Sequence, residues 1–564
     1  MIKFTFKLLN AKQKVNFYLL LVLAVIVACL ELIGIFSIFP FLTVISEPEI
    51  IRKNEYLFYV YNFFDFKKDS SFIQFLGICV IILFLLRGVF AISLTALKMI
   101  FTRYFHLDLT YRLFQHYLNL EYLEFKRKKT SSASEILVNE TLYVSNSITD
   151  LITLVTELIL IFLIFSTLMF INWQITSFSI LILIFISLFT IPITRALSEI
   201  GKKRADAQLK IYDVVTESMN IFKGIKILSA MELFNEKLLI HLKDFTKNQI
   251  SHSVLGEIPK YFIEILAIIF IMTAILILNS SSSSASSWIP IISTLAISFY
   301  RLLPSLNRLI SSYNQLRYNK RASTLILREF KGKTENLVNE SLNFKKEINF
   351  KNISVSYGSD MILKNINFKI SKGDKIALIG PSGSGKTTFL DVFMGLVKPD
   401  SGSIFIDDRE LNQKGIKSWR SKIGYLPQDN YLLNSTVFEN IYFGRKKDIE
   451  KINKSVKLSY LDEDPFFKIE KDNAIGELGN TLSGGQKQRL MMARLAYGDP
   501  EILILDEPTS ALDSGNEQKI MDEIFNSFQN ETIIVVSHRD KAISRCNKTV
   551  KINKGNLEII ENNY

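Results

Sequence analysis

The chain has 564 residues, of which 48% are hydrophobic, and its mean hydropathy is +0.21. With only 24 glycines and 12 prolines, collagen-like and low-complexity disordered classes are excluded. Three scattered cysteines are too few for a disulfide framework or a cysteine-rich zinc site. The net charge of +12 fits either nucleic-acid binding or a membrane protein with basic cytoplasmic loops.

Composition divides the chain into an apolar part and a polar part. Residues 1–320 carry long stretches without charge and predict a membrane domain. A stretch rich in lysine and asparagine predicts a linker over 321–345. Residues 346–564 have short apolar runs, glycine turns and dispersed charge, which is typical of a soluble domain. The first apolar run lacks a small-residue cleavage site and is too long for a signal-peptide core, so it predicts a membrane span.

The apolar part predicts six membrane spans. Residues 158–194 contain no charge and would form a helix about 55 Å long, too long for one crossing of a ~30 Å hydrocarbon core. A hairpin is therefore predicted at residues 172–174. The charge-free stretch 265–300 is divided by the serine-rich turn 279–287. The predicted spans are approximately 16–45, 71–98, 145–171, 174–197, 255–278 and 288–312.

Lysine and arginine predict the orientation of these spans. Residues 98–129 carry seven basic residues and residues 195–247 carry ten, whereas the turns 172–174 and 279–287 carry none. The basic segments are therefore predicted to be cytoplasmic. They account for much of the positive charge without nucleic acid, so no nucleic-acid partner is expected.

The first external loop is aromatic over residues 50–66. It contains Tyr56, Phe58 and Tyr59 among eight aromatic or leucine side chains, with basic residues on both sides. This pattern predicts a short helix on the outer membrane surface that contacts the substrate. An aromatic belt that only anchors the ends of two spans is an equal alternative.

The soluble domain contains a predicted phosphate-binding loop. The run from Gly380 to Thr387 matches G-x-x-x-x-G-K-[ST], follows the strand-like run 375–379 and precedes a helix-like run. Its backbone N–H groups, Lys386 and the Thr387 hydroxyl suit phosphates and Mg²⁺. The predicted nucleotide-binding residues here are Gly380, Pro381, Ser382, Gly383, Ser384, Gly385, Lys386, Thr387 and Thr388.

An acid pair ends a second apolar run, 502–505. Asp506 is predicted to hold Mg²⁺, and Glu507 to polarise the attacking water. Because adjacent strand residues point to opposite faces, the two carboxylates can take different roles.

The motif Leu482-Ser483-Gly484-Gly485-Gln486 then resembles the signature of the ATP-binding cassette (ABC) ATPases. The other motifs of that family occur in the same order along this chain, and the resemblance covers 346–564. It implies that each ATP is bound between the phosphate loop of one chain and the signature of another, in a homodimer with ATP and Mg²⁺ as cofactors. The residues that it adds are Tyr357 for adenine, Gln428 for the nucleotide and Mg²⁺, Ser483, Gly484, Gly485, Gln486, Asp513, and the switch histidine His538. Lys386, Glu507 and His538 are the predicted catalytic residues. Residues 476–479 occupy the place of an exporter loop but depart from its commoner sequence.

Six spans followed by one cassette resemble an ABC exporter half-transporter, which implies a six-span α-helical membrane domain fused to an α/β P-loop ATPase domain. Residues 212–226 resemble its coupling region, although an ordinary amphipathic helix is an alternative. The whole chain also resembles the bacterial lipid-linked oligosaccharide flippases of protein N-glycosylation. That resemblance implies ATP-driven flipping of an undecaprenyl-pyrophosphate-linked oligosaccharide in the bacterial cytoplasmic (inner) membrane, with the ATPase domain in the cytoplasm. The alternatives are a general lipid or drug exporter, and an ABC ATPase that regulates a partner without transport.

Cations within the predicted spans suggest how such a substrate is recognised. Arg87, Lys260, Arg301 and Arg308 are costly in hydrocarbon, by about 2.5–3.5 kcal/mol each on insertion scales. They are predicted to face a wet cavity and bind the pyrophosphate, since arginine presents a fork that matches its oxygens. The alternative is structural pairing with Glu31, Glu157, Glu257 or Glu264. Position near the cytoplasmic ends would also explain Lys260 and Arg308.

Overall fold

The computed structural model describes residues 6–171, 173–280, 285–335, 338, 340–428, 431–464, 467, 474–476, 479–508, 514–537 and 540–561. Two compact units divide the chain. The helical unit comprises Met1–Leu120 and Lys126–Gly332, and the α/β unit comprises Glu121–Phe125 and Lys333–Tyr564. The predicted fold class, a helical domain fused to an α/β domain, matches this division.

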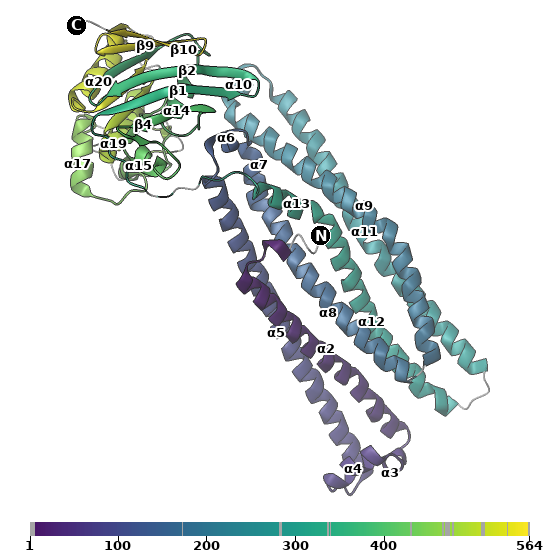
Figure 1. Cartoon of the computed structure of the whole chain (residues 1–564). Helices are drawn as coiled ribbons and strands as arrows, with labels where there is room; N and C mark the ends of the chain where they lie inside the picture. Colours follow the sequence, from purple (N-terminus) through teal and green to yellow (C-terminus); the bar gives the residue numbers. More distant parts are fainter. Residues whose placement is uncertain are drawn as a thin grey trace. The chain divides into compact units, whose positions relative to one another are not determined.

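Long helices build the helical unit, and α5 with its 50 residues is about 75 Å long, far more than a ~30 Å hydrocarbon core requires. Figure 1 shows α9 and α11 running side by side, α2 along α5, and α8 along α12. Within the described residues, three helices are long and apolar enough to cross a membrane: Ala11–Ile45, Asp69–Leu118 and Thr130–Thr167. The helices of this unit are α2 (Ala11–Ser46), α3 (Ile50–Lys53), α4 (Glu55–Phe63), α5 (Asp69–Leu118), α7 (Thr130–Glu135), the π-helical turn η1 (Ile136–Glu140), α8 (Thr141–Ile171), α9 (Trp173–Asn220), α10 (Phe222–Ile227), α11 (Met231–Ser280), α12 (Ala285–Tyr318) and α13 (Lys320–Glu329).

Three turns or linkers differ from their predicted form. Trp173 begins α9 directly, so residues 173 and 174 of the predicted hairpin 172–174 are helical, and residue 172 lies outside the described residues. Within the predicted serine-rich turn 279–287, α11 ends at Ser280 and α12 begins at Ala285. Residues 281–284 lie outside the described residues. The predicted linker 321–345 begins as α13, because Ala322 and Ile326 lie one turn apart and are buried in the helical unit.

The α/β unit holds two sheets (Figure 1). The antiparallel sheet has the order β2-β1-β4-β5, and the mainly parallel sheet has the order β10-β9-β3-β8-β7-β6. Phe350, Phe389 and Trp419 are buried in the core that joins the two sheets through α14. The strands are β1 (Glu347–Tyr357), β2 (Asp360–Ser371), β3 (Lys375–Ile379), β4 (Ser401–Ile406), β5 (Arg409–Glu410), β6 (Ile423–Leu426), β7 (Ile502–Asp506), β8 (Thr532–Val536), β9 (Lys548–Asn553) and β10 (Asn556–Glu561); the helices include α14 (Lys386–Phe393), α15 (Ile416–Ser421), α16 (Val437–Tyr442), α17 (Ile449–Leu458), α19 (Gly484–Gly498), α20 (Ser514–Ser527) and α21 (Asp540–Ile543).

A short segment from the first half of the sequence belongs to the α/β unit. Helix α6 (Tyr122–Lys126) follows the end of α5, and the segment Glu121–Phe125, which includes most of this helix, is part of the α/β unit. Tyr122 and Leu123 pack against the buried core of this unit, and the Glu121 N–H donates to the Lys333 carbonyl at 2.9 Å. The predicted boundary at residue 320 therefore omits this segment. Tyr122 and Leu123 are partly buried against a surface that is distant in sequence.

Candidate nucleotide-binding site

The phosphate loop joins β3 to α14 at the carboxyl edge of the parallel sheet. Gly380 has φ +151°, and a Cβ at this position would lie 2.2 Å from the Ile552 carbonyl oxygen. Gly385 has φ +107° and directly precedes the first residue of α14, Lys386. A residue with a Cβ would be strained at Gly380 and at Gly385, because both positions have a positive φ. The loop therefore brings backbone amides and the helix N-terminus to one place, which is an arrangement that binds phosphate.

Side chains of the loop have hydrogen-bonding capacity suited to a nucleotide. The Lys386 ammonium donates to the carbonyl oxygens of Gly380 at 2.6 Å and Pro381 at 3.1 Å, so it lies over the loop. The Ser384 hydroxyl oxygen is buried and has no hydrogen-bond partner among the residues that the structure describes. A phosphate oxygen would supply the missing acceptor and attract the ammonium. The residues present thus fit a polyphosphate chain.

The acid pair lies at the end of β7 in the same sheet. Asp506 is the last residue of the strand, and the Glu507 N–H donates to the Val536 carbonyl at 3.1 Å. Glu507 has φ 45°, a left-handed conformation that is uncommon for residues other than glycine. Its carboxylate accepts a hydrogen bond from the Gln428 side-chain amide at 2.9 Å. Two predicted site residues that are 79 positions apart in sequence are therefore in contact.

Burial dominates the electrostatics of Asp506. Burial raises the pKa of its carboxyl, and the neighbouring charge of Glu507 raises this pKa further. The hydrogen bond from the Tyr425 hydroxyl, at 3.4 Å, and the charge of Lys386 act in the opposite direction. Two adjacent carboxylates and one lysine form a site that favours an additional positive charge.

The signature residues begin a helix in this chain. Ser483 is the N-cap of α19, and its hydroxyl accepts from the Gln486 N–H at 3.3 Å. The Gln486 side chain accepts from the Ser483 N–H at 2.8 Å and donates to Asp464 at 3.1 Å. This capping box leaves Gly484 and Gly485 in the first turn, where N–H groups have no partner within the helix. The motif is therefore a second helix N-terminus with phosphate-binding capacity.

The remaining predicted residues have different positions. Tyr357 ends β1, and Thr388 is buried in α14. Asp513, His538 and the pair 477–478 lie outside the described residues.

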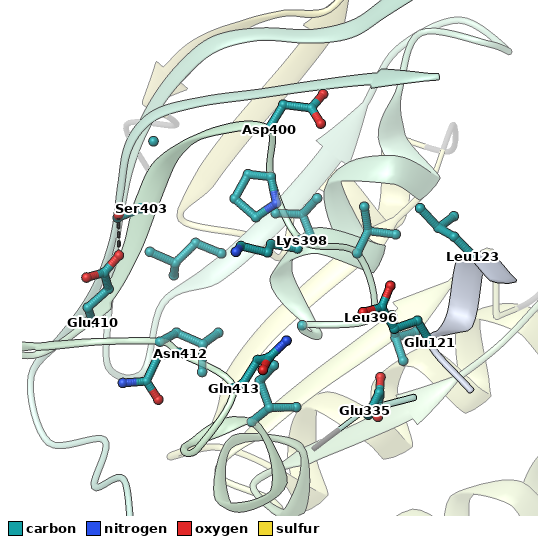
Figure 2. A pocket seen from close by; sticks show the side chains of 18 of the residues that line it. Glu121, Leu123, Glu335, Leu396, Lys398, Asp400, Ser403, Glu410, Asn412 and Gln413 are labelled. Carbon is teal, nitrogen blue, oxygen red and sulfur yellow. Dashed lines mark hydrogen bonds between the residues drawn. The ribbon is translucent and has the colours of Figure 1, made fainter. Parts of the chain in front are cut away.

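A pocket of about 960 Å³ lies in the α/β unit beside α6, where the sequence analysis predicted no site. Figure 2 shows Glu121 and, on α6, Leu123 on one side and the hydrogen-bonded pair Ser403 and Glu410 on the other. Glu335 also lines it, held by two hydrogen bonds from Arg420. Its charged residues carry both signs, including Lys398 and Asp400, so it has no marked preference for an anion.

The predicted substrate-binding cations of the helical unit are ion-paired wherever their side chains are described. Arg87 on α5 donates to Glu31 on α2 at 2.8 Å. Arg308 on α12 makes two hydrogen bonds to Glu157 on α8, at 2.5 and 3.3 Å. The Lys260 ammonium lies 3.6 Å from Glu257 on α11, and it lines a pocket of about 380 Å³ together with Arg308. Arg301 lies on α12, but its side chain is outside the described residues. The structural pairing that the sequence left as the alternative is present for Arg87, Lys260 and Arg308, with Glu31, Glu257 and Glu157.

The aromatic segment forms the two short helices α3 and α4. Tyr56, Phe58 and Tyr59 expose 84%, 43% and 70% of their surface. On the other side of the segment, Tyr61 and Phe66 pack against the buried Phe72.

Known protein families account for both units. Residues 17–300 match the ABC transporter transmembrane region, and residues 363–510 match the ABC transporter family. The chain belongs to the ABC transporter family. It is 30% identical to the ATP-dependent lipid A-core flippase of Wigglesworthia glossinidia brevipalpis over 79% of this chain and 78% of that protein. It is 26% identical to the lipid A-core flippase of Burkholderia orbicola over 85% and 82% of the two chains.

The fold of this ABC transporter is also that of a solved exporter. A bacterial Atm1-family ABC exporter with ATP bound matches with a TM-score of 0.77 and 19% identity over 98% of this chain and 95% of that one. The predicted fold class, a helical membrane domain fused to an α/β ATPase domain, is confirmed. The chain is an ATP-driven, membrane-spanning ABC exporter with half-transporter architecture, in which ATP hydrolysis is coupled to transport.

Tyr425 is a site residue that was not predicted from the sequence: its hydroxyl donates to the Asp506 carboxylate at 3.4 Å. Tyr122 was not predicted either, and it packs against the buried core of the α/β unit. The signal for Tyr122 is weak: an aromatic pair, Tyr122 and Phe125, within a charged cytoplasmic segment. Nothing in the sequence places Tyr122 against a core whose members come from the second half of the chain.

Proposed function

We propose that this ABC exporter is an ATP-driven flippase for an undecaprenyl-pyrophosphate-linked oligosaccharide, which it moves from the inner to the outer leaflet of the bacterial cytoplasmic membrane for protein N-glycosylation. It acts as a homodimer, and the ATPase domain is in the cytoplasm. The observation that supports this function is Arg87, a guanidinium inside an apolar helix.

Arg87 keeps donors available despite its ion pair. One terminal nitrogen of the guanidinium donates to Glu31, whereas its Nε is buried and makes no hydrogen bond to any described residue. A guanidinium has five N–H donors, and a pyrophosphate accepts them in pairs. In our proposal the substrate binds Arg87 together with Arg301, Arg308 and Lys260, and Glu31 holds Arg87 in place between substrates.

We extend the proposal to the ATP-binding residues, with the roles that the resemblance to ABC ATPases implies. Gly380 to Thr388 hold the phosphates, with Lys386 on the terminal ones, and Tyr357 stacks on adenine. Thr387, Gln428 and Asp506 would hold Mg²⁺, whose charge favours the phosphoryl transition state. Glu507 accepts the proton of the attacking water, assisted by His538. Ser483 to Gln486 and Asp513 serve the ATP of the partner chain.

Two further segments take part in our proposal. Helix α10 lies between α9 and α11 and exposes Phe222 and Ile227, so we assign it the coupling of ATP hydrolysis to helix movement. The exposed aromatic residues of α4 contact the polyprenyl chain at the outer surface.

A general lipid exporter is the second candidate. The relatives named lipid A-core flippases favour it. Lipid A is also a phosphorylated, glycosylated lipid, so the same cations would suit it. The substrates of the two candidate functions differ in the lipid part and in the linkage between lipid and sugar. Transport assays with defined lipids distinguish them.

The decisive experiment measures flipping in vesicles that contain only this protein. We expect ATP-dependent movement of a pyrophosphate-linked oligosaccharide lipid and little movement of a neutral glycolipid of equal chain length. Arg87→Ala and Arg301→Ala should reduce flipping at least ten-fold with basal ATPase retained, and lysine at these positions should restore it only in part.

Glu31→Gln is the matched control, since it breaks the same ion pair but keeps the guanidinium. Flipping close to the parental rate in Glu31→Gln, with loss in Arg87→Ala, supports binding by Arg87. Equal losses in both variants would assign Arg87 to structure alone. Faster movement of a lipid A-type substrate would favour the second candidate.

A further inference from the structure

Two buried carboxyl groups lie beside each other along the chain in the helical unit, where neither the ATPase site nor the proposed lipid site uses them. Glu135 is the last residue of α7 and Glu140 is the last residue of η1, and neither has any exposed surface. Both precede the predicted span 145–171, on its predicted cytoplasmic side. A buried carboxylate is costly unless it is paired and hydrogen-bonded, and otherwise it takes up a proton. Each of these groups therefore needs a cation or a proton.

The π-helical turn brings the two carboxyl groups toward one side of the helix. In an α-helix, residues five positions apart differ by about 140° around the axis. Here the Thr141 N–H donates to the Ile136 carbonyl, five positions earlier, and this wider winding reduces the angle between residues 135 and 140. Turns of this kind inside helices are frequent at functional sites. Helices α9 and α13 pack against this part of the chain.

Glu140 has a cation. The Arg204 guanidinium on α9 lies 3.2 Å from the Glu140 carboxylate and is itself almost fully buried. The same guanidinium donates to Gln208 at 2.7 Å and lies over the ring of Tyr143, 3.9 Å from its centre. These contacts hold Arg204 beside Glu140.

Glu135 has no such partner among the residues that the structure describes. Both of its carboxyl oxygens are buried without a hydrogen bond. Other cations on and around these elements are paired with other acids: Arg321 with Asp206, Lys129 with Asp213, and Lys128 with Glu329. The remaining titratable groups that surround the cluster are Tyr117 and His106 on α5, Tyr143 on α8, and Tyr318 on α12. A proton is therefore the simplest way to remove the charge of Glu135.

The electrostatics agree with this geometry. Burial, and after it the neighbouring charge of Glu140, raise the pKa of the Glu135 carboxyl from 4.5 to about 8. The charges of Arg204 and Arg321 act in the opposite direction. Burial also raises the pKa of Glu140, but Arg204 opposes this rise by its charge and by its contact. Of the two acids, Glu135 is thus the one that lacks a compensating cation.

We propose that Glu135 is a proton-binding site of the helical unit, and that loss of this proton weakens the contact of α7 and η1 with α9 and α13. The proton is taken up when the carboxyl is buried and is released when the carboxyl reaches water. Any rearrangement of these helices that hydrates Glu135 is then linked to pH. This inference depends neither on the transported lipid nor on the assigned roles of the ATPase residues.

The first test is hydrogen–deuterium exchange of residues 130–141 in the purified full chain. Glu135→Gln keeps the shape of the side chain and removes its ionisation, and comparison at equal pH cancels the intrinsic pH dependence of exchange. The buried carboxyl binds its proton more tightly than an exposed one, so the stability of this contact falls as the pH rises from about 4.5 to about 8. We expect the opening constant of the parent to rise relative to that of Glu135→Gln by up to about ten-fold per pH unit in this window. At pH 8 the variant should be the better protected of the two.

Two further variants control this test. Glu140→Gln removes the neighbouring acid but deprives Arg204 of its anion, so it should be less protected than the parent at pH 8. Glu199→Gln changes an exposed acid on α9 that pairs with Lys203, and it should behave as the parent at every pH. Equal pH dependence in Glu135→Gln and the parent would overturn the proposal. Better protection at pH 8 in Glu140→Gln than in Glu135→Gln would place the proton on Glu140 and overturn it as well.

Infrared spectroscopy observes the proton directly. Exposed carboxyl groups are ionised at neutral pH, so the C=O stretch of a protonated carboxyl reports buried acids. Glu135→Gln should remove part of this band, and the same part should disappear from the parent as the pH rises above about 8. An unchanged band in Glu135→Gln would contradict the proposal. Failure of Glu135→Gln to fold at pH 8 would also contradict it, because a neutral side chain must be tolerated where the parent holds a proton.

Discussion

Glu507 is constrained by its backbone and by its side chain at the same time. Its left-handed φ of 45° is sparsely populated, and such conformations persist where the surrounding structure holds them. The backbone bond to Val536 and the side-chain bond from Gln428 both hold it here. Strain of this kind gathers at functional sites, which agrees with the proposed role of Glu507 as the base.

Replacing Glu507 by glutamine tests that role. Glu507→Gln keeps the shape of the side chain but cannot accept the proton, so ATP hydrolysis should fall by about 10²-fold or more while ATP binding is retained. The measurements are steady-state ATPase and nucleotide binding of the purified chain. Glu501→Gln is the control at the start of the same strand, where Glu501 pairs with Lys372 and Lys422. Turnover of Glu507→Gln near the parental rate would exclude Glu507 as the base.

At the scale of elements, Arg204 joins α9 to the π-helical turn η1. Only 1% of Arg204 is exposed, and its guanidinium lies 3.2 Å from Glu140, bonds to Gln208 at 2.7 Å and stacks over the ring of Tyr143 at 3.9 Å. Glu140 is itself fully buried. The contact between α9 and η1 therefore depends on the buried ion pair of Arg204 with Glu140.

Arg204→Ala should lower the free energy of unfolding by about 3–5 kcal/mol, because it leaves the buried Glu140 carboxylate without its cation. Thermal unfolding in detergent is the measurement. Lys203→Ala removes an exposed pair with Glu199 from the next position and should have little effect. The double variant Arg204→Ala, Glu140→Ala should recover part of the loss. A transition unchanged in Arg204→Ala would contradict the importance of this charge pair.

The aromatic helix α4 has an exposed side and a packed side. Tyr56 and Tyr59 are exposed, whereas Tyr61 and Phe66 are packed beneath them. Replacing Tyr56 and Tyr59 by serine should lower flipping and leave basal ATPase and thermal stability unchanged. Asn62→Ser, an exposed change on the same helix, is the control. A parallel loss of ATPase would indicate that α4 only anchors the neighbouring spans.

At the scale of the whole molecule, the prediction concerns the arrangement of sites between two chains. Lys386→Ala removes a phosphate contact, and Ser483→Arg places a long cation at the signature. If each site combines two chains, a dimer with both changes on one chain loses both sites, whereas changes on opposite chains leave one site intact. Differently tagged chains allow each mixed dimer to be purified and its ATPase measured. Equal activities of the two mixed dimers would show that the sites are not shared.

Much of the ATPase site could be predicted from sequence, because its chemistry depends on contiguous residues. The phosphate loop and the signature need short segments with particular backbone conformations, and glycine, serine and lysine at fixed spacing report those directly. Contacts between segments that are distant in sequence could not be predicted in the same way. The ion pair of Arg87 with Glu31 joins residues 56 positions apart, and charge-free stretches predict spans without showing which faces meet.

A helical membrane domain and a P-loop ATPase can be predicted from the amino-acid sequence, since hydrophobic length and loop chemistry are local properties. Three features are visible only in the folded chain: Glu121–Phe125 packs with the ATPase unit, α13 replaces part of the linker, and Tyr425 contacts Asp506. The physical reason is that burial and hydrogen bonding are satisfied by whichever surface the fold brings near. A segment of five residues carries too little periodicity to identify that surface in advance.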